Sequence, residues 1–181
     1  LYIVGHSKGG NLAMYAASSI GKRTQSRIKA VYDYDGPGFR GDFLKSEGYL
    51  NMLPRIFTYV PQSSVVGMLL AHEEPYQVVE STNVGLLQHD PYSWNVLGKE
   101  FALLDDVDNM SQYTSQTLHS WIDGLSDEQR ELFVENVYNI ISESQAETLS
   151  DLVKPANFHL VMKALSSASS QTKQIIGDTM S

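Results

Sequence analysis

Short apolar runs rich in β-branched and aromatic residues alternate with helix-like stretches along the first hundred residues. The runs predict four strands, at residues 1–4, 27–34, 55–60 and 76–81. Helical spacing predicts helices at residues 11–20 and 42–52, and residues 61–71 predict a loop that enters an apolar helical turn. Strands that alternate with helices or long crossovers indicate an α/β fold with a mostly parallel sheet.

The first predicted strand begins at residue 1, in the run Leu1 to Val4. An unbroken apolar run of this kind is typical of a strand that is buried on both faces in a parallel sheet. We therefore expect the natural chain to contain further residues upstream. Without them this strand would present an unpaired apolar edge, through which the chain should aggregate or dimerise.

The charge pattern changes after residue 104. Residues 1–104 hold nine acidic and nine basic side chains, whereas residues 105–151 hold eleven acidic groups and one arginine. The pattern also becomes helical after residue 100, with a capping box at Ser126–Gln129. We predict a core domain at 1–104 and an acidic helical appendage at 105–181, with a protein partner or self-association as one role for the appendage.

Composition excludes several classes of protein. The 181 residues carry a net charge of −8, which argues against nucleic-acid binding, and contain no cysteine for disulfides or thiolate metal sites. No apolar run approaches the ~20 residues of a membrane helix, and we expect a cytoplasmic protein. No group of His, Asp and Glu has metal-ligand spacing along the sequence, so no metal is predicted.

The motif that carries chemistry is G-x-S-x-G at residues 5–9. It lies between a predicted strand and a predicted helix, which is the setting of a nucleophile elbow. We expect Ser7 to be the nucleophile and the Lys8 backbone N–H to donate to an oxyanion. Gly5 and Gly9 are expected to be required, because a β-carbon at either would collide with the strand or helix. The alternative is an ordinary strand-to-helix turn, such as a phosphate-binding loop.

His89 is the candidate general base among five histidines. It follows the fourth strand, in a loop at the edge where the loops of a parallel sheet gather, and it fits the chain order serine, acid, histidine. His6 lies inside the elbow and should point away from the hydroxyl. His72 is expected at the surface, and His119 and His159 belong to the appendage. The alternative for His89 is a hydrogen-bonded loop residue.

The acid that would orient the histidine is less clearly marked. Asp35 ends the second predicted strand beside the elbow, whereas Asp33 lies deeper on the same strand face. Asp35 could instead cap the glycine- and proline-rich turn that follows it. A Ser-His dyad helped by Gln62 or Ser64 is a further alternative.

Several motifs in order resemble one family. They are G-H-S-K-G-G-N-L-A, Y-D-Y-D-G-P-G-F, V-P-Q-S-S-V-V-G-M-L-L, V-V-E-S and Q-H-D-P-Y-S-W. Together they resemble, over about residues 1–101, the bacterial Mbeg1-like family of unknown function, an α/β-hydrolase group related to the class 3 lipases. The resemblance implies Ser7 as nucleophile and His89 as catalytic histidine. It also implies several strands before residue 1 and an upstream loop that supplies a second oxyanion donor.

From residues and resemblance together we expect part of an α/β-hydrolase-type sheet that acts as a serine hydrolase. The expected triad is Ser7, His89 and Asp35, the substrate is an acyl ester of a lipid or small molecule, and no cofactor is implied. Two alternatives stay open. One is a catalytically silent scaffold of the same fold, and the other is an acyltransferase or thioesterase.

Overall fold

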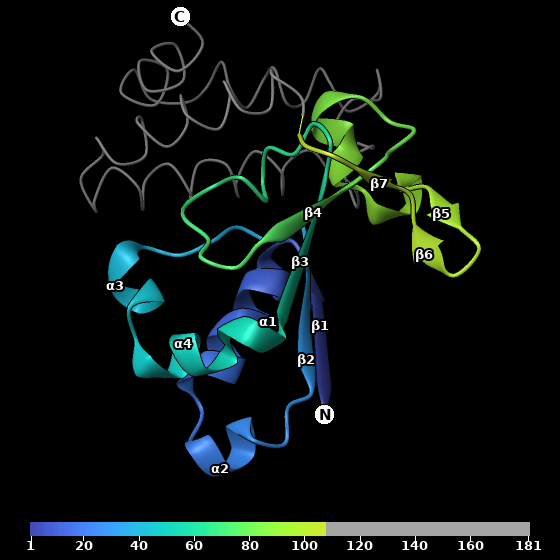
Figure 1. Cartoon of the computed structure of the whole chain (residues 1–181). Coiled ribbons are helices and arrows are strands. Elements are labelled where there is room, and N and C mark those ends of the chain that lie inside the picture. The colour runs from blue at the N-terminus through green and yellow to red at the C-terminus, as the bar shows by residue number, and fades with distance from the viewer. Residues whose placement is uncertain (108–181) are drawn as a thin grey trace, which may run out of the picture. The chain divides into compact units, whose positions relative to one another are not determined.

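The computed structural model describes residues 1–107 (Figure 1). The chain divides into two compact units, Leu1–Gln116 and Thr117–Ser181, and the described residues all lie in the first. The predicted boundary after residue 104 stays a prediction. The predicted capping box at residues 126–129, together with His119, His159 and the expected binding role of the acidic region, lies outside the described residues.

One mixed sheet of five strands forms the centre of the described part. Its order is β1-β2-β3-β4-β7, in which the first four strands are parallel and only β7 runs antiparallel. The carboxyl ends of the parallel strands therefore meet at one edge. The strands are β1 (Tyr2–His6), β2 (Ala30–Tyr34), β3 (Ile56–Pro61), β4 (Tyr76–Val79) and β7 (Leu103–Leu104).

Helices connect these strands and are short except for the first. A separate two-stranded sheet joins β5 and β6. The helices are α1 (Lys8–Ser19), α2 (Lys22–Gln25), α3 (Gly41–Leu44) and α4 (Glu47–Met52), the 3-10 helices are η1 (Leu53–Arg55), η2 (Gly85–His89) and η3 (Pro91–Ser93), and the hairpin strands are β5 (Val96–Leu97) and β6 (Glu100–Phe101).

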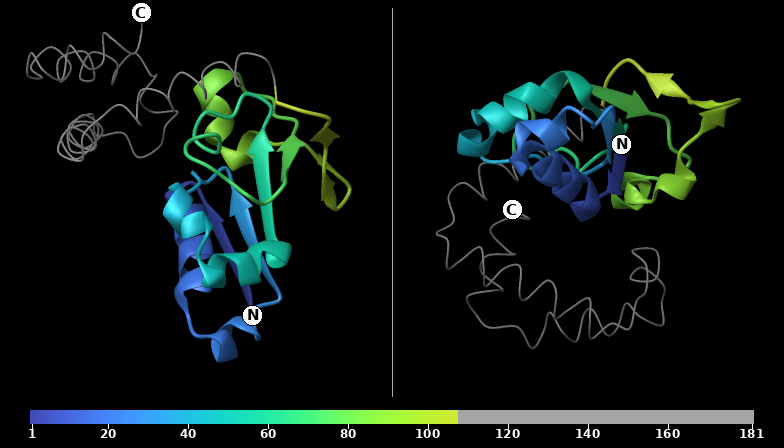
Figure 2. Two further views of the ribbon diagram at one scale, coloured as in Figure 1. Left: turned by 60° about the vertical axis from the view of Figure 1, so that its left-hand side comes forward. Right: turned by 90° about the horizontal axis from the view of Figure 1, so that it is seen from below.

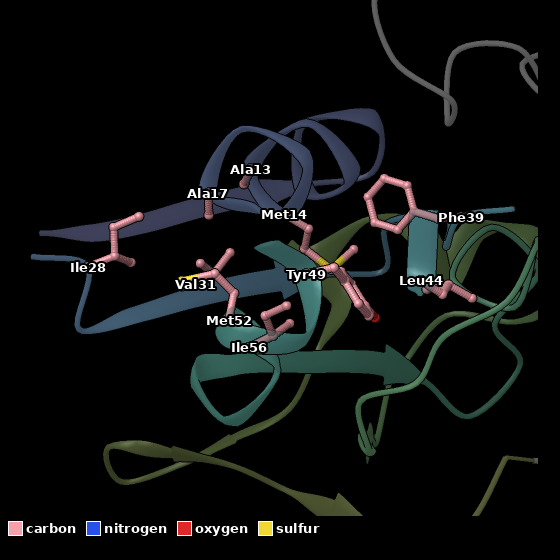
Figure 3. Packing of buried hydrophobic residues seen from close by; sticks show 10 residues of the cluster. All are labelled: Ala13, Met14, Ala17, Ile28, Val31, Phe39, Leu44, Tyr49, Met52 and Ile56. Carbon is pink, nitrogen blue, oxygen red and sulfur yellow. The ribbon is translucent and has the colours of Figure 1, made fainter. Parts of the chain in front are cut away.

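The main apolar core lies between the sheet and helices α1 and α4, which cover the same face (Figure 2). Met14 of α1, Val31 of β2 and Tyr49 of α4 are completely buried there. Figure 3 shows ten residues of this cluster between helix and strand. Burial of such side chains contributes about 1.5–3 kcal/mol each, so this layer fixes α1 firmly on the sheet.

The opposite face of the sheet is aromatic and partly open. Tyr34 and Tyr59 lie with ring centroids 5.6 Å apart, and Phe101 of β6 packs against both. At the β1 edge the residues Tyr2 and Val4 are 64% and 60% exposed. The described sheet thus has one face buried under helices and one that is only partly covered.

Several local predictions were wrong. Residues 42–52 form two short helices, with Lys45 and Ser46 between them, because Ser46 caps a new helix through its hydrogen bond from Tyr49 N–H. Residues 62–70 form turns and bends and contain no helix, although the Ser64 and Leu69 amides close single turns onto Pro61 and Val66. Short strands, not helices, lie at Glu100–Phe101 and Leu103–Leu104, at the start of the region where the sequence predicted helices. None of the helices within residues 1–107 has the length and apolar character needed to cross a bilayer.

Candidate active site

Ser7 occupies a sharp turn between β1 and α1. Its φ and ψ are 57° and −132°, a conformation that costs about 1–3 kcal/mol for a residue with a side chain. Its N–H donates to the Tyr34 carbonyl of the neighbouring strand at 2.9 Å, and α1 begins at Lys8. The Lys8 N–H thus lies in the first turn of a helix, where amides lack partners within the helix and the dipole favours negative charge.

The two glycines of the motif have different roles. A β-carbon on Gly5 would lie 2.1 Å from the Gly9 carbonyl oxygen, so glycine is required where β1 passes under α1. A β-carbon on Gly9 would meet nothing within 4 Å in the described chain. The expectation of a collision at Gly9 was therefore wrong, because this residue faces outward from the first helical turn.

His89 and Asp35 are joined by a hydrogen bond. His89 Nδ1–H donates to Asp35 Oδ2 at 2.6 Å, and both side chains are at least 90% buried. The other carboxylate oxygen, Oδ1, accepts from Ser64 Oγ at 2.5 Å and from Gly67 N–H at 3.0 Å. A carboxylate held on both oxygens fixes the imidazole with Nδ1 protonated, which leaves Nε2 as the nitrogen that can accept a proton.

The alternatives for the acid have other positions. Asp33 is completely buried, and its Oδ1 accepts from Gly36 N–H, so Asp33 and not Asp35 caps that turn. Gln62 exchanges hydrogen bonds with the backbone of Ser81. Ser64 donates a hydrogen bond to the Asp35 carboxylate. In the dyad alternative Ser64 would assist the histidine in place of an acid, whereas here it holds the acid that contacts His89.

His6 links the elbow to the segment that bears His89. Its Nε2–H donates to the His89 carbonyl at 2.7 Å, and the two rings lie 4.6 Å apart. Burial lowers the pKa of His6, although the hydrogen bond to His89 opposes this. Among residues 1–107 the Ser7 hydroxyl makes no hydrogen bond, and thus none to His89. A hydrogen bond between nucleophile and general base often tightens only when substrate binds.

A second polar cluster, missed by the sequence analysis, lies near the first. Asp33, His72 and Glu74 each offer one atom, and these atoms lie within 4.8 Å of one another. His72 was expected at the surface, but its side chain is only 11% exposed because it bonds to buried Glu74. The cluster was missed because residues 33 and 72 are far apart in sequence. The spacing His72-x-Glu74 was the only available signal.

Burial and charge perturb the pKa values in this cluster. Burial raises the pKa of Asp33 to about 7. Burial acts to lower the pKa of His72, but the hydrogen bond and charge of Glu74 outweigh it and the pKa is raised. Burial acts to raise the pKa of Glu74, but its hydrogen bonds to His72 and Tyr49 outweigh burial and the pKa is lowered.

A groove of about 520 Å³ opens on the other face of the sheet, beside Tyr34 and Tyr59. It is bounded by the β5–β6 hairpin and β7 and includes Lys99 and Glu100. Ser7, Asp35 and His89 are not among its lining residues, so this groove is not a binding cleft for the candidate triad.

Comparison with known proteins gives one match. A family model described as Mbeg1-like matches residues 1–139. No curated protein and no solved structure matches the chain. The match extends past the predicted boundary at residue 104 and contains all the site residues discussed above.

Proposed function

Because the chain belongs to the Mbeg1-like family, whose motifs it carries on the described site, we propose that it is a serine hydrolase of the α/β-hydrolase type. Ser7 is the nucleophile, His89 the general base and Asp35 the acid that orients it. The substrate is an acyl ester of a lipid or small molecule. The observation that carries the proposal is the hydrogen bond of 2.6 Å between His89 and Asp35 in a chain whose Ser7 has a strained backbone.

The mechanism follows from these groups. Ser7 Oγ attacks the ester carbonyl while its proton passes to His89 Nε2, and Asp35 stabilises the imidazolium that forms. The Lys8 N–H donates to the tetrahedral oxyanion. When the intermediate collapses, the leaving alcohol takes the proton from His89 and the acyl group stays on Ser7. Water then attacks the acyl-enzyme by the same route and releases the carboxylic acid.

Two features support this assignment over an ordinary turn. The positive φ of Ser7 is a conformation that folded chains retain mainly where function uses it. Asp35 also has a positive φ, 52°, and its carboxylate is buried with a partner on each oxygen. A loop histidine without a catalytic role does not need a second strained residue beside it.

The direct test is covalent labelling with a fluorophosphonate, followed by peptide mapping. It should be run on the chain together with any residues that its gene encodes before Leu1. We expect the label on Ser7, no label in Ser7→Ala, and unchanged labelling in Ser19→Ala, a matched change on the exposed end of α1. A folded parent chain that does not label would overturn the proposal in favour of a silent scaffold.

The role of Asp35 is tested in the same assay. Replacing the orienting carboxylate by an amide costs up to about 10⁴-fold in rate in a serine protease. We expect Asp35→Asn to slow labelling strongly, with the thermal unfolding of the variant as the check on its fold. Ser64→Ala removes a donor to Oδ1 but leaves the His89 contact, so it should slow labelling much less. Product analysis with competing alcohols and thiols then separates hydrolysis from acyl transfer.

A further inference from the structure

The buried cluster of Asp33, His72 and Glu74 is separate from the proposed triad in its hydrogen bonds. Asp33 extends from β2, and His72 and Glu74 lie in the segment before β4. We propose that this cluster binds one divalent transition-metal ion, for which Zn²⁺ is the best fit. Each side chain offers one ligand atom, and these atoms lie within 4.8 Å of one another.

Two atoms of the cluster point to an ion. Within the described part of the chain, Asp33 Oδ2 and His72 Nε2 are both buried and make no hydrogen bond. Such atoms are rare in folded proteins, because an unsatisfied buried polar atom costs about 1–3 kcal/mol. One is a carboxylate oxygen and the other an imidazole nitrogen, and both types are common zinc ligands.

The remaining contacts resemble the surroundings of a metal-binding histidine. His72 Nδ1–H donates to Glu74 Oε1 at 2.8 Å, which leaves the lone pair on Nε2. A carboxylate on the second ring nitrogen is the usual way to orient a ligating imidazole. Glu74 is itself held by the hydroxyls of Thr58 and Tyr49, so the His72 ring has little freedom to turn away.

Charge favours a divalent ion. When deprotonated, the two carboxylates and the neutral imidazole together carry a charge of −2 in a buried position. Within residues 1–107, no lysine or arginine forms an ion pair with Asp33 or Glu74. A divalent cation neutralises this charge, with Asp33 Oδ2 and His72 Nε2 as its protein ligands and water in the remaining positions. Glu74 is not a direct ligand in this arrangement, because it orients the His72 ring through Nδ1. The mixture of imidazole and carboxylate suits Zn²⁺, whereas Mg²⁺ and Ca²⁺ prefer oxygen ligands alone.

The test is a titration of the chelator-treated parent chain with Zn²⁺ by calorimetry, with Mg²⁺ as the contrasting ion. Co²⁺ absorption in the visible range reports ligand type directly. Asp33→Asn keeps the oxygen that accepts from Gly36 N–H but removes the charge, and His72→Gln removes the imidazole. Two variants outside the cluster are the controls. They are Glu73→Gln, at an exposed neighbouring position, and His6→Gln, whose ring lies against His89.

We expect one equivalent of Zn²⁺ per parent chain and no comparable binding of Mg²⁺. Asp33→Asn and His72→Gln should each weaken Zn²⁺ binding by at least about tenfold, and both controls should leave it unchanged. Absence of saturable binding by the parent overturns the proposal whatever the variants do, and means that protons alone neutralise the cluster. Binding that survives both cluster variants, or that disappears in His6→Gln, overturns it as well.

Discussion

Gly5→Ala tests the close approach of β1 and α1 on which the elbow depends. An added β-carbon would lie 2.1 Å from the Gly9 oxygen, 2.3 Å from the Gly9 carbonyl carbon and 2.5 Å from the Gly10 nitrogen. Ordinary contacts begin at 3.4 Å, and all three atoms belong to backbone. No side-chain rotation can relieve the overlap, so the first turn of α1 must move away from the sheet by about 1 Å.

The cost can be estimated from this geometry. Extra carbons in packed interiors typically cost about 1–3 kcal/mol when side chains can adjust. Here the obstacle is backbone, so we expect a loss of at least about 3 kcal/mol in the free energy of unfolding. That is a large part of the ~5–15 kcal/mol of a typical domain. Gly9→Ala is the matched control. It adds the same atom in open space and should stabilise by about 0.4–1 kcal/mol.

Urea denaturation of the parent and the two variants measures both values, with equal slopes as the check on a common unfolding transition. Fluorophosphonate labelling of Ser7 provides the functional readout, which Gly5→Ala should abolish and Gly9→Ala should retain. If the free energy of unfolding of Gly5→Ala lies within about 0.5 kcal/mol of the parent value, the helix does not approach the strand as closely as described, and the reasoning is refuted.

Three further predictions concern the core, pH and association. Met14→Ala empties a completely buried site and should cost about 2–5 kcal/mol in urea denaturation; a loss below 1 kcal/mol would contradict the described packing. Burial lowers the pKa of His6, so below about pH 6.5 the unfolded chain takes up a proton more readily and stability falls with acidification. His6→Gln should flatten that part of the stability profile, and an unchanged slope would argue against it. Sedimentation should show concentration-dependent association of the 181-residue chain through its β1 edge, reduced by Val4→Lys; a monodisperse parent monomer would exclude this.

Strands and the elbow were predictable because their signals are local. An apolar run followed by G-x-S-x-G and an alanine-rich stretch defines β1, the turn and α1 without reference to the rest of the chain. The same holds for β3 and β4, whose ends differ from the prediction by no more than two residues. The strand predicted at residues 27–34 starts later, at Ala30. The amides of Arg27 and Ile28 instead donate to the carbonyls at the end of α2, those of Thr24 and Gln25.

The features that sequence reasoning missed depend on contacts between distant segments. His72 is followed in the sequence by Glu73, Glu74 and Pro75, residues that are typical of a protein surface. Only the fold brings His72 close to buried Asp33. The support that Ser64 gives to Asp35 spans 29 positions and could not be separated from the dyad alternative before the fold was known. Gly9 was misjudged because the motif does not tell which glycine faces the strand.

The Asp35 carboxylate has a consequence for engineering by segment exchange. It joins the end of β2, the turn at Ser64 and Gly67, and the 3-10 helix that bears His89. A graft that replaces only one of these segments with that of a relative would leave a buried anion short of a donor. The three segments therefore form one exchangeable unit, and chimeras with a relative should carry all three together or none.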